Sequence, residues 1–431
     1  MLIQFNFSNY KSFRDEVSLD LSAAKMTEHN ERVVTIGKEK VLRAACIYGA
    51  NAGGKSCVYE AFDFMTEYVI SSLRFHSTDT RSSDEDKNYS MVPVPFLFDR
   101  ESVNKESSFE VFFAMPGDTT GKMYNYGFCV DENGVTEEWL NKKNKTAREY
   151  RSVFYREKEQ YEFHGFTKLQ EKMLRQAISE KVLLVSLGAQ LNIEICRKVR
   201  DWFYTNECAD YADLSSAYNL YRTLPGEFID DSKVQEDVVR YFSSFDRHIK
   251  GFDIKEIPSE EEKDPERKKY FIGTKHKIVG SKEYAMIPLE WESAGTLKMF
   301  SLYSRIHSVL EKGGVFFVDE LNARLHPLLV RNIILAFLNP SINTKNAQII
   351  FTSHDTWQLS NQFLRRDEIW LVDKNADGVS SLYSLADFET EDGAKIRKDE
   401  NYEKNYLLGK YGAIPELTNI FWKEEASDGR A

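Results

Sequence analysis

The pattern at the start of the chain predicts strands followed by a helix. Polar and apolar residues alternate at 2–7, and residues 17–21 alternate in the same way, which indicates a hairpin partner. Residues 41–48 form a short, mostly apolar run that ends at a glycine, as is typical of a buried strand in an α/β sheet. Apolar positions recur at helical spacing from residue 55 to residue 73, so we expect a helix directly after the glycine turn.

The middle of the chain has a different pattern. From about residue 90 to residue 165, strand-like segments rich in aromatic residues alternate with Gly, Asp and Asn turns, which favours a small antiparallel sheet. Residues 166 to about 250 read as amphipathic helices, and a charged loop follows at 259–269. After this loop the α/β pattern resumes. Three apolar runs are expected to be buried strands there: 315–318, 348–351 and 368–372.

These patterns predict an α/β fold with a mixed central sheet, a small antiparallel β subdomain and a helical insertion. The expected segments are an N-terminal lobe at 1–89, the β subdomain at 90–165, the insertion at 166–265 and a C-terminal lobe at 266–431. We find no internal repeat and no sustained heptad pattern, so a long coiled-coil arm is not expected.

Composition narrows the class of protein. The 431 residues include 57 basic and 68 acidic side chains, and the net charge of −11 argues against a surface that coats nucleic acid or anionic lipid, although a local basic groove stays open. No apolar stretch reaches the roughly 18 residues of a membrane helix, and the start lacks the layout of a secretory signal. The 5 scattered cysteines contain no CxxC pair and indicate reduced thiols in a cytoplasmic protein.

A glycine-rich segment between the predicted strand and helix carries the clearest chemistry. It fits G-x-x-x-x-G-K-[ST], in which backbone N–H groups and a helix N-terminus surround phosphate oxygens. Lys55 would neutralise the β- and γ-phosphates, and Ser56 would hold Mg²⁺. The alternative is a purely structural glycine turn. The expected nucleotide-binding residues are Gly49, Ala50, Asn51, Ala52, Gly53, Gly54, Lys55, Ser56 and Cys57.

Two further strand ends carry candidate catalytic residues. Asp319 and Glu320 follow the apolar run 315–318, where the aspartate can support Mg²⁺ and the glutamate can orient or deprotonate an attacking water. A strand that ends in solvated acids would look the same. His354 follows the next run and is expected near the γ-phosphate, with an ordinary hydrogen-bonded histidine as the alternative.

A short small-residue motif precedes another predicted helix. Ser293 and Gly295 lie directly before the helical run 297–310, and a hydroxyl with small residues at a helix start can bind an anion. By itself this motif is also an ordinary N-cap. Its position shortly before the Asp-Glu strand favours the functional interpretation.

The order of these motifs resembles the ABC-type ATPases of the SMC, RecF and OLD group. The phosphate loop is followed by SAGT before a helix, by VFFVDE, by LNARLHP and by FTSHD. The resemblance is closer to the compact AAA-family ATP-binding proteins of abortive-infection systems, the RloA/AbiL-like proteins, which also share the NYKSF segment at 9–13 and the aromatic-glycine cluster at 406–415. It implies an ABC-type P-loop NTPase fold with ATPase lobes at both ends of the chain.

This resemblance implies a homodimer that sandwiches two ATP molecules. Ser293 and Gly295 would meet the γ-phosphate bound by the other subunit's loop, and residues 321–327 would link the two sites. Gln190 is our choice for the glutamine that senses Mg²⁺ in such ATPases. The motif is SAGT and not the LSGGQ of transporters, which disfavours a membrane pump.

The expected function is a cytoplasmic, Mg²⁺-dependent ATPase that uses Lys55, Glu320 and His354 and regulates a separate effector, such as a nuclease, in anti-phage defence. The chain has no R-x₄-H pair of its own, and the E-x-K at 266–268 reads as part of a solvated charged loop. Two alternatives stay open. One is a RecF- or SMC-like protein in which ATP gates binding to DNA, and the other is a nucleotide-sensing scaffold with negligible turnover.

Overall fold

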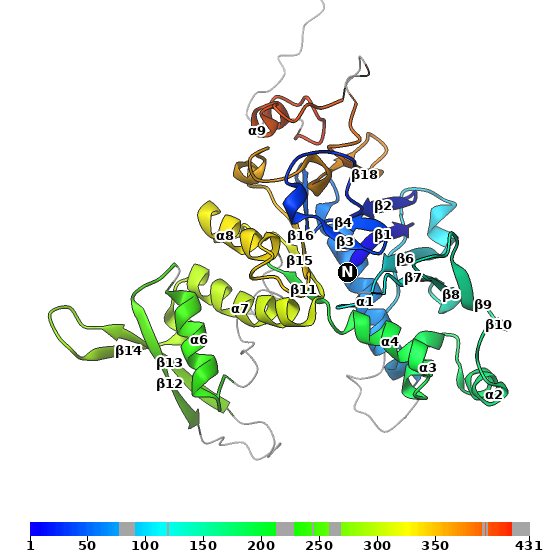
Figure 1. Cartoon of the computed structure of the whole chain (residues 1–431), viewed down its shortest axis with the longest axis horizontal. Helices are drawn as coiled ribbons and strands as arrows, with labels where there is room; N and C mark the ends of the chain where they lie inside the picture. Colours follow the sequence, from blue (N-terminus) through cyan, green and yellow to red (C-terminus); the bar gives the residue numbers. More distant parts are fainter. Residues whose placement is uncertain are drawn as a thin grey trace, which may run out of the picture.

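The computed structural model describes most of the chain, and it is an α/β structure built on two large sheets (Figure 1). The described residues are 1–76, 91–118, 120–212, 228–243, 245–257, 269–389, 393 and 395–415. No helix among these residues has the length and apolar character needed to cross a bilayer.

The first large sheet is mostly parallel and contains the three buried strands that the apolar runs predicted. Its order is β11-β15-β16-β5-β17-β18, and only β18 runs antiparallel to its neighbour. The strands are β11 (Glu207–Asp210), β15 (Val315–Asp319), β16 (Gln348–Thr352), β5 (Ala44–Gly49), β17 (Ile369–Lys374) and β18 (Ser380–Ser384). Since parallel strands end at one edge, the residues after β5, β15 and β16 meet there.

Helices cover both faces of this sheet. Helix α1 (Lys55–Ser71) packs on one face, and α7 (Ala294–Lys312) and α8 (Pro327–Leu338) pack on the other. Alternate side chains of β15 point to opposite faces, so Phe317 enters the core with α1 and Phe316 enters the core with α7 and α8. Burial on both faces explains why the strand runs are almost wholly apolar.

The second large sheet is antiparallel. Its order is β10-β9-β8-β7-β6-β1-β2, and all neighbours are antiparallel. The strands are β1 (Leu2–Ser8), β2 (Val17–Asp20), β6 (Ser107–Phe113), β7 (Met123–Val130), β8 (Val135–Lys143), β9 (Arg151–Glu157) and β10 (Gln160–Phe163). The predicted hairpin of the first two strands is present, but β1 also pairs with β6. The hydrogen-bond ladder therefore crosses the segment boundary expected at residue 90.

The segment expected as a helical insertion contains helices and two strands. The helices are α2 (Lys168–Ala177), α3 (Leu184–Gln190), α4 (Glu194–Phe203) and α6 (Ser232–Phe242). Strand β11 belongs to the parallel sheet, and β12 (Ile249–Ile257) pairs with β13 (Lys269–Lys277), which pairs with β14 (Tyr284–Pro288). This three-stranded sheet and α6 form a lobe at one side of the molecule (Figure 1). Much of the charged loop before β13 lies outside the described residues.

The remaining elements are short. Strands β3 (Val34–Ile36) and β4 (Glu39–Val41) form a two-stranded sheet, and α9 (Tyr402–Leu407) lies near the end of the described chain. Six 3₁₀ turns occur among the described residues: Asn30–Arg32, Ser72–His76, Ser102–Asn104, Leu289–Trp291, Thr356–Gln358 and Arg366–Glu368. Tyr406 of α9 packs its ring 6.1 Å from that of Tyr48, so the C-terminal aromatic cluster shares a core with the end of β5.

Candidate nucleotide-binding site

The glycine-rich segment forms a tight loop between β5 and α1. The N–H of Gly53 donates to the carbonyl of Ala50 (3.1 Å), Ala52 has a left-handed φ of 61°, and Asn51 is exposed at the tip. A Cβ atom on Gly49 would lie 2.4 Å from the carbonyl oxygen of Val372, so only glycine fits where the loop leaves the sheet. The loop therefore presents backbone, with few side chains, at the N-terminus of α1.

Gly54 is the residue on which the closure of this loop depends. Its φ of 118° is open only to glycine without strain, and a Cβ atom would lie 2.7 Å from the hydroxyl of Ser380 and 2.8 Å from that of Ser12. The Ser380 hydroxyl donates to the Gly53 carbonyl (2.6 Å), and Ser12 lies 3.5 Å from the Cys57 thiol. The NYKSF segment thus packs against the phosphate loop next to Gly54, and its Ser12 has a structural role there.

Lys55 lies at the first position of α1 and reaches back over the loop. Its Nζ donates to the carbonyls of Gly49 (3.0 Å) and Ala50 (3.1 Å) and lies 3.4 Å from Nδ1 of His354. Burial lowers the pKa of Lys55, and the nearby Glu320 and Asp319 carboxylates oppose this shift. The ammonium group therefore lies at the mouth of the loop, where a phosphate group could replace the carbonyl contacts.

Asp319 and Ser56 meet at the edge of the sheet, although their strands are separated by β16. Asp319 is buried and accepts a hydrogen bond from the hydroxyl of Thr352. Burial raises the pKa of Asp319, and the hydroxyls of Thr352 and the nearby Ser56 oppose the rise. A serine hydroxyl and a carboxylate are oxygen ligands that suit Mg²⁺. The structure therefore brings together the two residues that we expect to bind the metal.

Glu320 turns out of the strand with a left-handed φ of 52°, which is uncommon for a residue with a side chain. Its N–H donates to Thr352 Oγ1 (2.9 Å), and its carboxylate lies 2.8 Å from Nε2 of His354. Because an ammonium group only donates, the contact with Lys55 fits the tautomer of His354 in which Nδ1 accepts and the Nε2–H donates to Glu320. The three predicted catalytic residues thus form one chain: Lys55, His354 and Glu320.

Asp210 is an acidic group at this edge that the sequence analysis missed. It ends β11 and is the direct neighbour of Asp319 across the parallel ladder, and its charge raises the pKa of Asp319. A strand-like run ending in an acid was the available signal, but the run is only four residues long.

Gln190 is not brought to the site. It is exposed at the end of α3, and Ser186 of the same helix donates to the carbonyl of Val69 (2.6 Å), close to the C-terminal end of α1. The phosphate loop lies at the opposite end of this 17-residue helix, roughly 20 Å away at 1.5 Å per residue. The prediction that Gln190 senses magnesium is therefore wrong, because Gln190 lies too far from the phosphate loop.

Ser293 and Gly295 lie at the start of α7, separate from the loop of their own chain. Ser293 is the exposed N-cap of the helix, and its hydroxyl accepts from the N–H of Thr296 (3.1 Å). A Cβ atom on Gly295 would lie 3.1 Å from the carbonyl oxygen of Arg324. Within the part of the chain that the structure describes, no hydrogen bond or ion pair joins Ser293 or Gly295 to residues 49–57.

The sequence range that holds this site matches a known protein family. A family model described as "AAA domain, putative AbiEii toxin, Type IV TA system" matches residues 44–356, which is well over half of the chain. The chain belongs to this AAA-domain family. The matched range contains the phosphate loop, the Ser293 motif, Asp319, Glu320 and His354. The protein therefore has an AAA domain of this family, with its phosphate loop after β5 of the mostly parallel sheet.

Several solved structures whose chains follow a similar path are SMC head domains, and their sequence identity to this chain is low. The SMC head bound to the C-terminal winged-helix domain of ScpA is 15% identical, with 89% of this chain and 97% of that chain covered and a TM-score of 0.42. The SMC head of Thermotoga maritima is 14% identical, with 89% and 98% covered and a TM-score of 0.37. The Pyrococcus furiosus head with an extended coiled coil is 12% identical, with 89% and 96% covered and a TM-score of 0.37. A search of curated proteins finds no significant relative.

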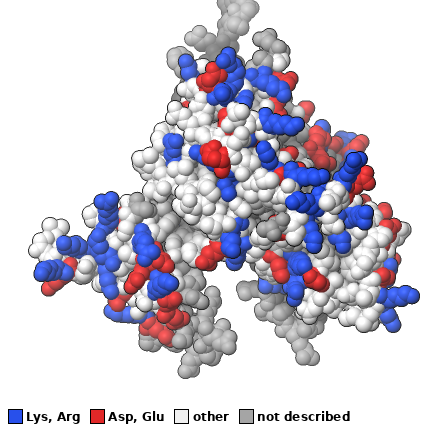
Figure 2. All heavy atoms as spheres, viewed as in Figure 1, with Lys and Arg blue, Asp and Glu red and all other residues white. Residues whose placement is uncertain are grey.

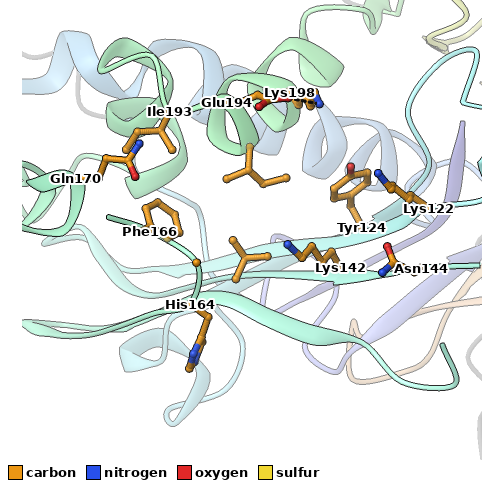
Figure 3. A pocket seen from close by; sticks show the side chains of 13 residues that line it. Lys122, Tyr124, Lys142, Asn144, His164, Phe166, Gln170, Ile193, Glu194 and Lys198 are labelled. Carbon is orange, nitrogen blue, oxygen red and sulfur yellow. Dashed lines mark hydrogen bonds and ion pairs between the residues drawn. The ribbon is translucent and has the colours of Figure 1, made fainter. Parts of the chain in front are cut away.

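A separate cavity of about 560 Å³ opens between the antiparallel sheet and α4 (Figure 3). Tyr124 and Lys142 line it from the sheet, Phe166 lines it from the segment before α2, and Glu194 and Lys198 lie above them on α4. Glu194 and Lys198 form an ion pair at 2.6 Å. None of the residues predicted for nucleotide binding lines this cavity, so the candidate site is the edge of the parallel sheet.

Proposed function

We propose that this protein is a Mg²⁺-dependent ATPase that dimerises around ATP and regulates a separate effector in anti-phage defence. The observation that carries this proposal is the convergence of Ser56 with Asp319, and of Lys55 and His354 with Glu320, at one edge of the parallel sheet. If the glycines formed only a structural turn and the acids were only solvated, these residues would have no need to meet after three different strands.

Phosphate binding would use the loop and the start of α1. The backbone N–H groups of the loop and the helix N-terminus attract the triphosphate, and Lys55 exchanges its carbonyl partners for phosphate oxygens. Ser56 and Asp319 would hold Mg²⁺, with Asp210 adding negative charge beside them. The ion, when bound, neutralises charge on the β- and γ-phosphates.

Hydrolysis would use Glu320 as the group that orients the attacking water and accepts its proton. His354 holds the Glu320 carboxylate through Nε2 and faces Lys55 through Nδ1, so a γ-phosphate near Lys55 would also lie near the histidine. The left-handed turn at Glu320 directs its side chain away from the strand axis and towards His354.

The proposed dimer follows from the placement of Ser293. This residue is exposed at a helix N-terminus and lies apart from the loop of its own chain. A two-fold arrangement would let each Ser293 and Gly295 meet the triphosphate held by the partner's loop, because a C₂ contact uses the same surfaces on both copies. ATP would then close the dimer and hydrolysis would reopen it.

The description of the matching family bears on the effector and the biological setting. The matching family is described by a toxin of a type IV toxin–antitoxin system, which supports a role in defence. We place the protein in the cytoplasm and expect the effector, such as a nuclease, to be a separate chain. ATP-dependent closure would change the surface that this effector recognises.

A second candidate function is ATP-gated binding of DNA, and the lobe beside α7 supports it. On one face of β13 and β14, Lys275 lies opposite Met286 and Lys277 lies opposite Tyr284. Tyr284 is 52% exposed. Basic side chains gather on this lobe with acidic ones below them (Figure 2). Lysines interleaved with an exposed aromatic residue suit a nucleic-acid strand. Binding to DNA that requires ATP and weakens steeply with salt would favour this function.

Phosphate release and oligomeric state together test the main proposal. The wild-type protein should release phosphate from MgATP, Lys55→Ala should lose ATP binding, and Glu320→Gln should bind ATP and accumulate as a dimer, as seen by light scattering. A Glu320→Gln protein that stays monomeric at saturating MgATP would exclude the sandwich. Co-purification with neighbouring gene products, with and without ATP, identifies the effector.

A further inference from the structure

A buried lysine on α7 makes contacts that the proposed reaction does not use. Lys298 has no exposed surface, and its Nζ donates to the backbone carbonyls of Glu320 (2.9 Å), Leu321 (2.9 Å) and Ala323 (3.0 Å). An ammonium group has three N–H donors, so all of them are satisfied by one turn of backbone. Among the described residues no carboxylate forms an ion pair with Lys298.

The same ammonium group also contacts the end of β11. It lies 4.1 Å from the centre of the Tyr211 ring, which is within the range of a cation–π interaction. The N–H of Tyr211 donates to the carbonyl of Asp319 (3.2 Å), and its hydroxyl lies 2.6 Å from that of Ser301 on α7. Lys298 therefore lies where α7, the turn after β15 and the end of β11 meet.

The turn that Lys298 holds contains two residues in unfavourable conformations. Glu320 and Arg324 both have left-handed φ values, 52° and 60°. Such residues keep this conformation only where surrounding contacts impose it. Gly295, one helical turn before Lys298, packs against the Arg324 carbonyl on the same face of α7. The first two turns of α7 thus hold both ends of the turn that begins with Glu320.

From these contacts we propose that Lys298 is a positioning residue that couples Ser293 to the Glu320 of its own subunit. Contact between Ser293 and the triphosphate in the partner subunit would fix the start of α7, and Lys298 would transmit this position to the turn that carries the catalytic glutamate. Hydrolysis at one site would then depend on occupancy of the other. This inference rests on the proposed ATP-sandwiched dimer.

A charged side chain is unexpected at this buried position if its only function is to pack α7 against the turn. Burial disfavours the charged form, and it lowers the pKa of Lys298 to about 7. A methionine would fill a similar volume without this cost. The lysine is explained if three hydrogen bonds to one turn are needed to hold Glu320, since only an ammonium group provides three donors from a single atom.

The test compares Lys298→Met with Lys312→Met, a control at the exposed C-terminal end of the same helix. We expect Lys298→Met to keep ATP affinity within about twofold and to lower turnover by about tenfold or more, because only the positioning of Glu320 is lost. In a Glu320→Gln background, Lys298→Met should still dimerise with ATP. The control should match the wild type in ATP affinity and turnover, and in the Glu320→Gln background it should dimerise as Glu320→Gln alone does.

A merely structural role for Lys298 would give a different result. Turnover per folded molecule would be unchanged, or it would fall by the same factor as ATP affinity, and either result overturns the coupling. If Lys298→Met does not fold, Lys298→Gln decides, because its amide group offers two donors where the ammonium group offers three to the carbonyls of this turn. It should lower turnover by about threefold or more with ATP affinity unchanged, and equal turnover would overturn the inference. Failure of Glu320→Gln alone to dimerise would instead reject the proposed function.

Discussion

Nε2 of His354 lies 2.8 Å from the carboxylate of Glu320, although the two residues follow different strands. The contact exists because β15 and β16 are parallel neighbours and end at the same edge of the sheet. A histidine that holds the glutamate on one side and faces Lys55 on the other links the proposed base to the phosphate loop. This relationship makes the role of His354 testable separately from that of Glu320.

We expect His354→Ala to lower turnover by about a hundredfold and to change ATP affinity by less than about threefold, because the glutamate loses its hydrogen-bond donor while the loop is unchanged. Phosphate release and equilibrium ATP binding measure the two effects. His307→Ala is the control, since His307 lies 3.5 Å from Glu311 on the exposed side of α7, away from the loop. A His354→Ala protein with wild-type turnover would show that the contact is structural.

The two aspartates at the sheet edge should differ in their response to magnesium. Asp319→Asn should abolish Mg²⁺-dependent turnover, because the residue that pairs with Ser56 loses its charge. Asp210→Asn should raise the Mg²⁺ concentration needed for half-maximal turnover by about tenfold, since it removes a neighbouring charge and no proposed ligand.

A magnesium titration of phosphate release measures both aspartate variants. Asp201→Asn, exposed on α4, is the control and should titrate as the wild type does. Equal magnesium requirements for Asp210→Asn and the wild type would remove Asp210 from the site.

The sequence predicted which residues would meet at this edge because its motifs lie at the ends of parallel strands. An apolar run followed by Asp319 and Glu320 is typical of a buried strand that ends at the edge of an α/β sheet, and the glycines before Lys55 require a loop rather than a helix. Local pattern and long-range structure agree at these positions. The range that the family model matches, residues 44–356, contains these motifs.

Features that depend on non-local pairing could not be read in this way. The pairing of β1 with β6 joins residues about a hundred positions apart, and no local pattern specifies it. Gln190 was chosen from sequence context, and it failed because helix packing places it at the far end of α1. Lys298 carries no signal at all in the sequence, since its role depends on three carbonyls of a distant turn.

The phosphate loop should not accept a side chain at Gly54. Gly54→Ala places a methyl group 2.7 Å from the Ser380 hydroxyl in a backbone conformation that alanine avoids, so we expect ATP binding to weaken by about a hundredfold or more. Gly165→Ala is the control, because Gly165 also has a positive φ of 84° but no neighbour within 4 Å. Calorimetric titration with ATP and a melting curve for each variant separate loss of the loop from loss of the fold. Equal ATP affinity in the two variants would contradict the tight packing of the loop.

A half-buried carboxyl on α1 should make stability depend on pH. Burial raises the pKa of Asp63 from 3.8 to about 6, and the nearby Cys208 thiol opposes the rise. Between these two values the folded state keeps a proton that the unfolded state has released. The free energy of unfolding should therefore fall as pH rises from about 4 to about 6, by at most about 3 kcal/mol at 1.36 kcal/mol per pKa unit.

Asp63→Asn removes this titration, so its free energy of unfolding should lose the extra dependence on pH and should exceed that of the wild type most clearly above about pH 6. Urea denaturation between about pH 4.5 and about pH 7.5 measures the difference at each pH. Asp201→Asn, an exposed change on α4, should leave the wild-type slope unaltered. Asp63→Asn and the wild type could instead show the same dependence of the free energy of unfolding on pH. That result would contradict the prediction, because it would mean that the folded protein does not hold the extra proton on Asp63.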